Sequence, residues 1–431
     1  AQPDPARVMF VLDEPHRPQL SGCTIDGHLV HPGASVTDLT VFVRPGEAAY
    51  ELSLEWSGQV YRRSDVEALA EEYARMLEWG VDHPGTPWNA LGVDADAVGA
   101  PLTRELRPLP VLIDEQATDQ PSTPAVRCGD DRLTYDELVT RAAAVAAALA
   151  ERGVGAGDRV GVLLPRSVDL VVTILAVQRL GAAYVPVDVS YPDQRVDLLL
   201  RLGAPRLAVT DDAGARRIDG PVVTSAELAG GAAHVPERSS VSSAVGLDDP
   251  AYVIFTSGST GRPRGVLVDQ RRLASSTLAR LDRYTDATGR PSMVDRFLMV
   301  SSVGFDSSVA GIFWTLVSGG ELVLPTEHEV HDVDALATLI SEATVTHTLM
   351  VPTLYRALLE RKPAALASLR TVVVAGETCP ASLVELHHRH LPDAELWNEY
   401  GPTETTVWAT AHHCRPGDDP VPIGLPLSLI H

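Results

Sequence analysis

Two patterns of apolar residues divide the chain near residue 110. From about Val111 onward, short apolar runs alternate with longer stretches in which apolar residues recur every three or four positions. Short runs predict buried strands, and the three- to four-residue spacing predicts helices. Strands that alternate with helices predict parallel sheets flanked by helices on both faces. We expect strands at 159–164, 183–187, 206–209, 251–255, 321–324, 345–349, 370–374 and 394–398, and helices at 167–180, 307–317 and 333–342.

The first 85 residues have a different pattern. Three β-rich runs, at 8–12, 37–43 and 49–56, precede a stretch with helical spacing between Ser64 and Trp79. A segment rich in proline and glycine follows, as is typical of linkers. We therefore expect a small α+β unit at 1–85, a linker at 86–110 and an α/β core at 111–431.

The formal charge is −22, from 57 acidic and 35 basic residues. So acidic a surface repels phosphate backbones and anionic lipids, which disfavours nucleic acid and membranes as partners. The chain opens with no signal segment, and no apolar run approaches the roughly 20 residues that a membrane span needs. The cysteines lack metal-site spacing, which predicts reduced thiols and a cytoplasmic location. They are Cys23, Cys128, Cys379 and Cys414.

A loop rich in glycine and hydroxyl groups follows the strand expected at 251–255. Glycines let backbone amides approach an anion, and the hydroxyls and two closing arginines add donors and positive charge, so the loop is suited to hold phosphate. It is not a Walker A loop, because that spacing and its Lys-Ser/Thr ending are missing. A flexible surface loop is the alternative, which Pro263 between Arg262 and Arg264 disfavours. The candidate residues are Thr256, Ser257, Gly258, Ser259, Thr260, Gly261 and Arg264.

A second polar loop follows the strand expected at 394–398. It contains Tyr400, Thr403 and Glu404 around a Gly-Pro pair. A glutamate among threonines can hold Mg²⁺ while the hydroxyls meet phosphate oxygens, and the tyrosine ring offers a flat face for a base. The alternative interpretation is an ordinary turn with incidental threonines.

Together the two loops resemble core motifs of the adenylate-forming (AMP-binding) superfamily, which read close to YTSGSTGxPKG and NxYGPTE. Four further segments resemble motifs of this superfamily and occur in the family's order along the chain. Residues 133–138 resemble the LTYxEL motif and 181–188 resemble the second core motif. Residues 305–308 resemble the FDxS motif, and 375–377 resemble the AGE segment that contacts adenine. The resemblance covers residues 110–426 and implies an α/β fold, the large N-terminal subdomain of these enzymes, with stacked, mostly parallel sheets flanked by helices. The FDxS motif and the segment GAAYVPVD at 181–188 are more similar to the corresponding motifs of nonribosomal peptide synthetase adenylation domains than to those of acyl-CoA ligases or luciferases.

The N-terminal α+β unit resembles the last hundred residues of a condensation domain, which precedes the adenylation domain in an elongation module. The condensation active-site pattern HHxxxDG is absent. The resemblance therefore implies a catalytically silent remnant.

The resemblance also implies an activity. An amino-acid carboxylate attacks the α-phosphate of ATP, which gives aminoacyl-AMP and pyrophosphate, and the acyl group then passes to the phosphopantetheine thiol of a peptidyl carrier (thiolation) domain. ATP and Mg²⁺ are the implied cofactors. The implied partners are the amino acid and the carrier domain, together with a small accessory activator protein in some synthetases.

Roles follow for individual residues. The loop 256–265 would hold the β- and γ-phosphates, Thr403 the α-phosphate, and Tyr400 would stack on adenine, while Asp306 would pair with the α-ammonium of the substrate. The catalytic set is Thr256, Arg264, Thr403 and Glu404, with Glu404 as the metal ligand. The nucleotide-binding set is Thr256, Ser257, Gly258, Ser259, Thr260, Gly261, Arg264, Ala375, Gly376, Glu377, Asn398, Tyr400, Gly401 and Thr403.

The same resemblance supplies a substrate pocket. Its small and apolar members predict an open floor and apolar walls. Glu399 differs, because a carboxylate in an apolar pocket is costly unless it is paired. We expect its partner to be a donor on a medium-to-large substrate, tyrosine-like or basic; alternatively, Glu399 faces the nucleotide site or bonds a neighbouring hydroxyl. The pocket set is Phe305, Asp306, Ser307, Ala310, Leu349, Val373, Ala375, Glu399, Val407 and Trp408.

The sequence departs from the family at three places. Arg264 replaces a lysine, Gln270 replaces a frequent histidine, and no YRTGD-type motif or near-terminal catalytic lysine follows 422–426. The only lysine, Lys362, lies in a surface-like segment. We therefore expect an adenylation domain without its C-terminal subdomain and with weak activity. An acyl- or aryl-CoA ligase and a non-catalytic nucleotide- or partner-binding module are the alternatives.

Three histidine clusters are interpreted as structural. Residues 387–390 are expected at the solvated end of a helix, where positive charge suits the helix dipole. Residues 328–331 are one residue short of the HExxH spacing, and 412–414 are expected at a strand end.

Overall fold

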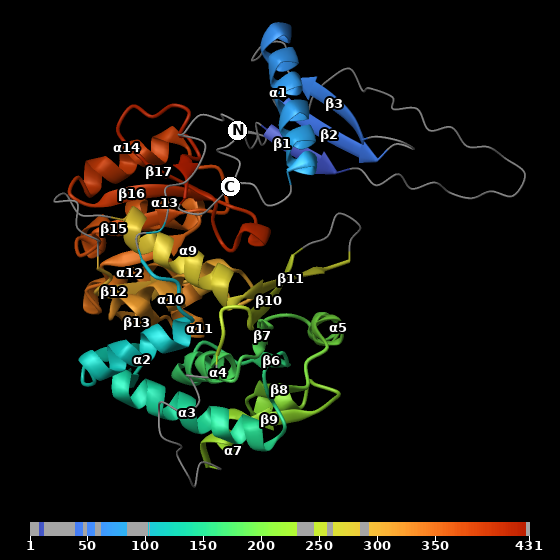
Figure 1. The fold of residues 1–431 in the computed structure, drawn as a ribbon. Helices are drawn as coiled ribbons and strands as arrows, with labels where there is room; N and C mark the ends of the chain where they lie inside the picture. Colours follow the sequence, from blue (N-terminus) through green and yellow to red (C-terminus); the bar gives the residue numbers. More distant parts are fainter. Residues whose placement is uncertain are drawn as a thin grey trace, which may run out of the picture. The chain divides into compact units, whose positions relative to one another are not determined.

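The computed structural model describes residues 8–12, 39–45, 50–56, 62–83, 102, 104–230, 245–256, 262–284 and 293–427. The chain forms two compact units, Ala1–Ala95 and Asp96–His431 (Figure 1). The division falls within the segment predicted to be a linker. None of the helices in the described ranges is both long enough and apolar enough to cross a membrane.

The first unit is a three-stranded sheet with one helix. Strand β2 lies between β1, which runs parallel to it, and β3, which runs antiparallel. The helix α1 packs against the sheet, where Leu39, Val41 and Val66 are buried. The elements are β1 (Val8–Leu12), β2 (Leu39–Pro45), β3 (Tyr50–Trp56) and α1 (Arg63–Asp82).

The second unit contains two sheets. The smaller has six strands in the order β11-β10-β7-β6-β8-β9, all parallel except β11. Its strands are β6 (Arg159–Leu163), β7 (Ala183–Pro186), β8 (Leu207–Thr210), β9 (Val222–Thr224), β10 (Pro250–Thr256) and β11 (Arg264–Asp269). Its helices are α3 (Tyr135–Glu151), α4 (Val168–Arg179), α5 (Asp193–Gly203), α6 (Asp212–Ala215) and α7 (Ser225–Gly230).

The larger sheet has nine strands in the order β18-β17-β16-β15-β14-β12-β13-β4-β5. They are β4 (Pro124–Cys128), β5 (Asp131–Thr134), β12 (Arg296–Met299), β13 (Glu321–Leu324), β14 (His347–Met350), β15 (Thr371–Val374), β16 (Glu395–Tyr400), β17 (Thr410–His413) and β18 (Leu425–Pro426). The helices are α2 (Leu109–Asp119), α9 (Gln270–Arg283), α10 (Ser307–Ser318), α11 (Glu327–His331), α12 (Val333–Glu342), α13 (Pro352–Arg361) and α14 (Ala381–His390), with the 3-10 turns η3 (Pro363–Leu366) and η4 (Thr403–Thr405).

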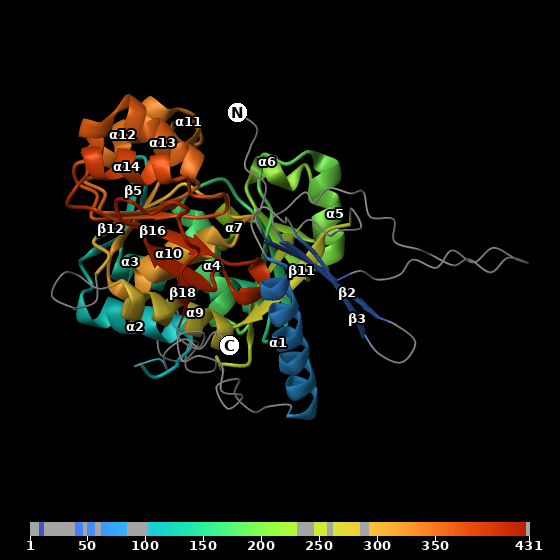
Figure 2. The ribbon, with the colours of Figure 1, turned by 90° about the horizontal axis from the view of Figure 1, so that it is seen from above.

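Helices cover both faces of the larger sheet. Helices α12, α13 and α14 lie side by side on one face, over their own apolar cluster (Figure 2). Helices α2, α9 and α10 pack on the other face and join the core that α3 and α4 share with the smaller sheet. This arrangement is the stacked α/β architecture that the strand–helix alternation predicts.

The register of the larger sheet brings distant loops to one edge. Leu349 in β14 is paired with Met299 in β12 and with Val373 in β15, and Val373 is paired with Trp397 in β16. These four strands are parallel, so the loops after them all leave the same edge. Ligands bind at this carboxyl edge in open α/β sheets.

The segment 133–138 has a structural role. Thr134 and Glu137 form a capping box that begins α3. The hydroxyl of the buried Tyr135 donates to the Leu316 carbonyl at 3.1 Å and to the Gly320 carbonyl at 2.9 Å. It thereby ties the start of α3 to the end of α10.

Tyr135→Phe is expected to lower the free energy of unfolding by about 1–3 kcal/mol, because it deprives two carbonyls in the core of their donor. Denaturant unfolding would measure the loss. The affinity for a nucleotide should not change, because Tyr135 is remote from the loops at the sheet edge. No loss of stability would mean that this bond is unimportant.

Candidate nucleotide and amino-acid site

The predicted phosphate loop connects two paired strands. Thr256 ends β10 and is the antiparallel partner of Arg264, the first residue of β11. The Thr256 hydroxyl donates to the Arg264 carbonyl at 3.5 Å, and both Arg262 and Arg264 are exposed. The hairpin therefore sets a hydroxyl and two guanidinium groups at the base of the loop. The other predicted residues, Ser257, Gly258, Ser259, Thr260 and Gly261, lie outside the described residues.

Gln270, at a position where the family often has histidine, is a structural residue here. It begins α9 and is fully buried, and its side-chain oxygen accepts a hydrogen bond from the Leu109 amide at 3.3 Å. The glutamine that replaces the frequent histidine therefore helps to pack α9 against α2.

The two ends of the second predicted loop, near Gly401 and Trp408, are packed closely against each other. A side-chain carbon at Gly401 would lie 2.4 Å from the Trp408 Cα, so only glycine fits there. The Ala409 amide donates to the Tyr400 carbonyl at 2.8 Å. Thr406 and Val407 have φ angles of 63° and 83°, in the left-handed region that β-branched residues avoid. Such strain persists where the surroundings impose it, most often at binding sites.

The nucleotide candidates in this loop have different surroundings. The Tyr400 side chain is 54% exposed, and Glu404 is exposed at the start of the 3-10 turn η4. Asn398 is buried, and its amide nitrogen donates to the Pro422 carbonyl at 2.8 Å. The ring of Tyr400 is therefore open to a ligand. The side chain of Asn398 instead holds the segment that follows the site by a hydrogen bond.

The segment 375–377 lies beside this loop, after β15. Gly376 has a φ of 82° and is exposed. The Glu377 carboxylate accepts hydrogen bonds from the Thr353 hydroxyl, at 2.9 Å, and from the Thr353 amide, at 3.2 Å. Exposed apolar side chains, those of Val351 and Ile423, also occur in the loops at this edge. This edge thus presents open backbone and apolar surface next to the Tyr400 ring.

Asp306 directly precedes α10, the helix that packs against β12. Its Oδ2 atom is buried and has no hydrogen-bond partner among the described residues. Burial raises the pKa of this carboxyl, although hydrogen bonds from Thr403 and from the amides of Ser307 and Asp306 act in the opposite direction. Buried polar groups are nearly always bonded. The free oxygen therefore marks a place for a donor from outside the chain.

Glu399 has its partners inside the protein. Both of its carboxylate oxygens pair with the Arg280 guanidinium, with Nη2 3.0 Å from Oε2, and the Tyr284 hydroxyl donates to Oε1. The expectation that this carboxylate awaits a donor on the substrate is wrong for that reason. Arg280 and Tyr284 were missed because the partners are 119 and 115 positions away in the sequence.

The remaining pocket candidates differ in their burial. Ala310, Leu349, Val373 and Trp408 are buried. Ser307, Ala375 and Val407 are partly buried, and Phe305 is exposed. Leu349 and Val373 are neighbours in the sheet, and Asp306 precedes the first turn of α10, which contains Ala310. The structure therefore brings the predicted amino-acid site and the second polar loop to one edge of the larger sheet.

A comparison with protein families decides the assignment. Residues 113–430 match the family described as AMP-binding enzyme. The chain belongs to that family. It is 36% identical over 425 residues to CymA of Salinispora arenicola, a probable nonribosomal peptide synthetase. This alignment covers 95% of the chain but only 5% of CymA, so the chain spans a small part of that relative.

Solved structures agree with the sequence match. The N-terminal subdomain of NpsA from Klebsiella oxytoca, in complex with 3-hydroxybenzoyl-AMSN, superposes with a TM-score of 0.67 at 29% identity, over 75% of this chain and 79% of that one. The nonribosomal peptide synthetase FmoA3 in its AMPPNP-bound form gives a TM-score of 0.69 at 26% identity, over 97% of this chain and 47% of that one. These matches confirm the predicted fold and membership of the adenylation enzymes.

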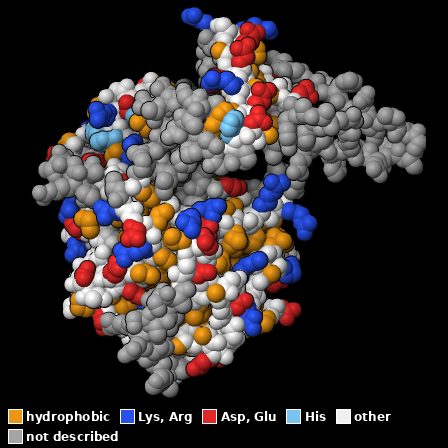
Figure 3. All heavy atoms as spheres, in the orientation of Figure 1, with side chains coloured by type: hydrophobic (Ala, Val, Ile, Leu, Met, Phe, Trp, Pro, Cys, Tyr) orange, Lys and Arg blue, Asp and Glu red, His pale blue; other side chains and the backbone are white. Residues whose placement is uncertain are grey.

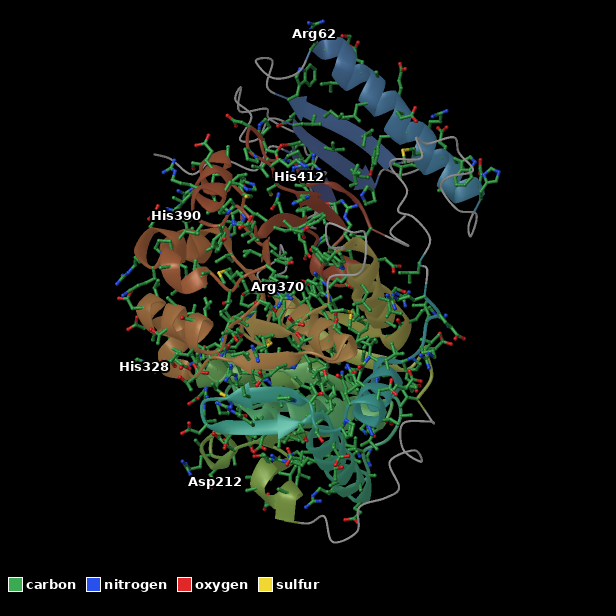
Figure 4. The ribbon with its side chains drawn as sticks, turned by 90° about the vertical axis from the view of Figure 1, so that its left-hand side faces the viewer. Arg62, Asp212, His328, Arg370, His390 and His412 are labelled. Carbon is green, nitrogen blue, oxygen red and sulfur yellow. The ribbon has the colours of Figure 1, made fainter. Side chains whose placement is uncertain are left out.

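The histidine clusters of this AMP-binding chain lie on separate elements. His387 is buried in the core, where its ring bonds the Tyr355 hydroxyl at 2.6 Å and the Ala394 carbonyl at 2.8 Å, and burial lowers its pKa to about 4. Residues 387–390 do form the end of a helix, α14, as expected, and His390 is exposed, but His387 faces the core and not the solvent. Figure 4 shows His328, His390 and His412 on different elements. Across the described ranges, no three His, Cys, Asp or Glu side chains gather as metal ligands would.

The structure describes three of the four cysteines. Cys128, Cys379 and Cys414 are free, and Cys23 lies outside the described residues. On the face drawn in Figure 3, acidic and basic side chains are interspersed among those that the structure describes.

Proposed function

We propose that this chain is the nucleotide- and amino-acid-binding core of a peptide-synthetase adenylation domain. In this role it joins an amino acid to ATP as aminoacyl-AMP, with release of pyrophosphate. The acyl group would then pass to the phosphopantetheine thiol of a carrier domain. The observation that carries the proposal is the buried oxygen of Asp306, which has no hydrogen-bond partner in the described part of the chain and which an α-ammonium group would complete.

The nucleotide would lie along the loops that end the strands. The Tyr400 ring and the open backbone at Gly376 suit a base, because one offers a flat face and the other allows close approach. Thr403, beside Asp306, would meet the α-phosphate, and Thr256 and Arg264 at the base of their hairpin would face the outer phosphates. Catalysis of this kind consists of positioning and charge neutralisation.

Magnesium would bind at Glu404. Mg²⁺ prefers oxygen ligands, and typically takes one or two carboxylates together with phosphate oxygens and waters. An exposed carboxylate next to Thr403 fits that ligand set. When bound, the metal would neutralise charge on the phosphates.

The test is the affinity of the 431-residue chain for acyl-AMSN analogues, measured by calorimetry. We expect an aminoacyl analogue to bind at least about tenfold more tightly than the analogue that has a hydroxyl in place of the amine, because only the ammonium satisfies Asp306. Equal affinities, or a preference for an aryl-acyl analogue, would favour an aryl-acid-activating enzyme and contradict the proposal.

We also propose that residues 1–85, within the first compact unit, are the end of a condensation domain with no role in adenylate binding. The alignment with CymA, which extends over 95% of the chain, supports this view. Removal of residues 1–95 should leave the affinity for the aminoacyl analogue within about twofold, since each unit has its own hydrophobic core among the described residues. Calorimetry on the shortened chain would check it. A large loss of affinity would give the N-terminal unit a function in the site.

A further inference from the structure

We propose that Arg280 and Tyr284 act as specificity-positioning residues, which neutralise Glu399 from within the protein so that the substrate pocket accepts an uncharged, apolar amino-acid side chain. The inference rests on the proposed function and names the substrate class of that same site. Neither residue is among the pocket positions predicted from the sequence.

The three side chains form a complete polar cluster. Arg280 donates to both oxygens of Glu399, and Tyr284 adds a third donor. Arg280 is 1% exposed and Glu399 is 4% exposed. Two-pronged contacts between arginine and carboxylate are among the strongest in proteins. A phenol or an ammonium on a substrate would have to displace these donors to reach Glu399.

The cluster packs against Trp408, one of the predicted pocket positions. The guanidinium carbon of Arg280 is 4.0 Å from the centre of the Trp408 ring, and the Tyr284 ring is parallel to that ring at 5.8 Å. Guanidinium groups bind well over tryptophan faces. The charged cluster therefore packs against the Trp408 ring, which is itself buried.

Helix α9 also fixes the chain on either side of Val407. The Ser276 hydroxyl donates to the Thr406 carbonyl at 2.7 Å, and the Trp408 indole donates to the Ser276 carbonyl at 3.3 Å. These bonds hold the left-handed backbone at Thr406 and Val407 in place. Arg280 is close enough to the ammonium anchor for its charge to lower the pKa of Asp306, which opposes the larger effect of burial. The cluster and the anchor therefore belong to one site.

The walls of the pocket are apolar. With Glu399 paired, the other predicted members beyond the Asp306 anchor offer little charge compensation. A charged side chain placed among them would lose its hydration without gaining a partner, at a cost of several kcal/mol. These members are Ser307, Ala310, Leu349, Val373, Ala375, Val407 and Trp408.

Substitution of Arg280 and substitution of Glu399 should change the preferred substrate in opposite directions. Arg280→Met keeps much of the side-chain length but leaves Glu399 buried and unpaired, so a cationic substrate would supply the missing charge. Glu399→Gln leaves Arg280 unpaired, so an anionic substrate would be favoured. Residues that only maintain the fold would change the affinity for all substrates in the same proportion.

The experiment measures the affinities of leucyl-, ornithyl- and glutamyl-AMSN for the parent chain, Arg280→Met, Glu399→Gln and the double variant Arg280→Met/Glu399→Leu. The parent should bind the leucyl analogue at least about tenfold more tightly than the other two. Arg280→Met should improve ornithyl relative to leucyl by about tenfold or more, and Glu399→Gln should do the same for glutamyl. The double variant should restore the apolar preference.

Several results would overturn the inference. One is a parent chain that prefers the ornithyl or glutamyl analogue, which needs no variant to be observed. Another is a uniform loss of affinity in both single variants, with the ratios unchanged. Failure of the proposed function is distinct from these results: in that case the parent would not discriminate between the leucyl analogue and its hydroxy-acid counterpart.

Discussion

Asp306→Ala is expected to weaken binding of an aminoacyl-AMSN analogue by about a hundredfold or more, because it leaves an ammonium group in a desolvated site without its carboxylate. Binding of AMPPNP should be nearly unchanged, because the predicted nucleotide contacts lie in the neighbouring loops. Calorimetric titration of both ligands into the parent and the variant would measure the difference.

Two controls make this result specific. Asp393→Ala removes an exposed aspartate and should leave both affinities unchanged. Burial raises the pKa of Asp306, so its charge, and with it the affinity for the aminoacyl analogue, should be lost on acidification at a higher pH than for an ordinary aspartate. Asp306→Asn should abolish this pH dependence. An Asp306→Ala variant that binds the aminoacyl analogue like the parent would refute an amino-acid site at this position.

Gly401→Ala is the second change with a large expected effect. The added carbon would lie 2.4 Å from the Trp408 Cα and 2.7 Å from the Ala409 nitrogen, and backbone atoms cannot move aside as a flexible side chain can. We expect a loss of unfolding free energy of about 1–3 kcal/mol, as for other overpacked sites. We also expect the affinity for an aminoacyl analogue to fall at least about tenfold, because the displaced segment carries Trp408.

Gly155→Ala provides the matched control. A side-chain carbon at Gly155 would have no neighbour within 4 Å, so this variant should behave like the parent. Thermal unfolding and calorimetry on both variants would make the comparison. If Gly401→Ala bound the analogue normally at full stability, the close packing of residues 401 and 408 would not matter to the site.

The sequence predicts the helices and strands in which apolar residues recur with a regular spacing. Residues 321–324 form β13 as expected, and the run at 251–255 becomes β10 with one residue added at each end. The motifs also predict which loops meet, because parallel strands carry their loops to one edge. The antiparallel strand β11 was not expected, whereas the expected strand end at 412–414 coincides with the end of β17.

Long-range pairing was the information that the sequence did not provide. Glu399 correctly indicated a buried carboxylate that needs a partner, but the partner came from α9, a helix that the periodicity analysis did not predict. Within that helix, Arg280 occupies a buried position among Leu273, Leu278 and Leu281. A basic residue at an apolar position was the signal that could have suggested a buried ion pair.

The pairing of Arg280 with Glu399 bears on how such chains could be recombined. A chimaera whose crossover falls between residues 281 and 398 takes one member of the pair from each parent. Where the other parent lacks the complementary charge, the hybrid keeps a buried ion with no counter-ion, which costs several kcal/mol and endangers folding regardless of how well the junction is designed. Exchange of the whole stretch from α9 to Trp408 keeps the two charges together. Transfer of the proposed specificity therefore requires that α9, a helix outside the predicted pocket positions, be exchanged with the pocket residues.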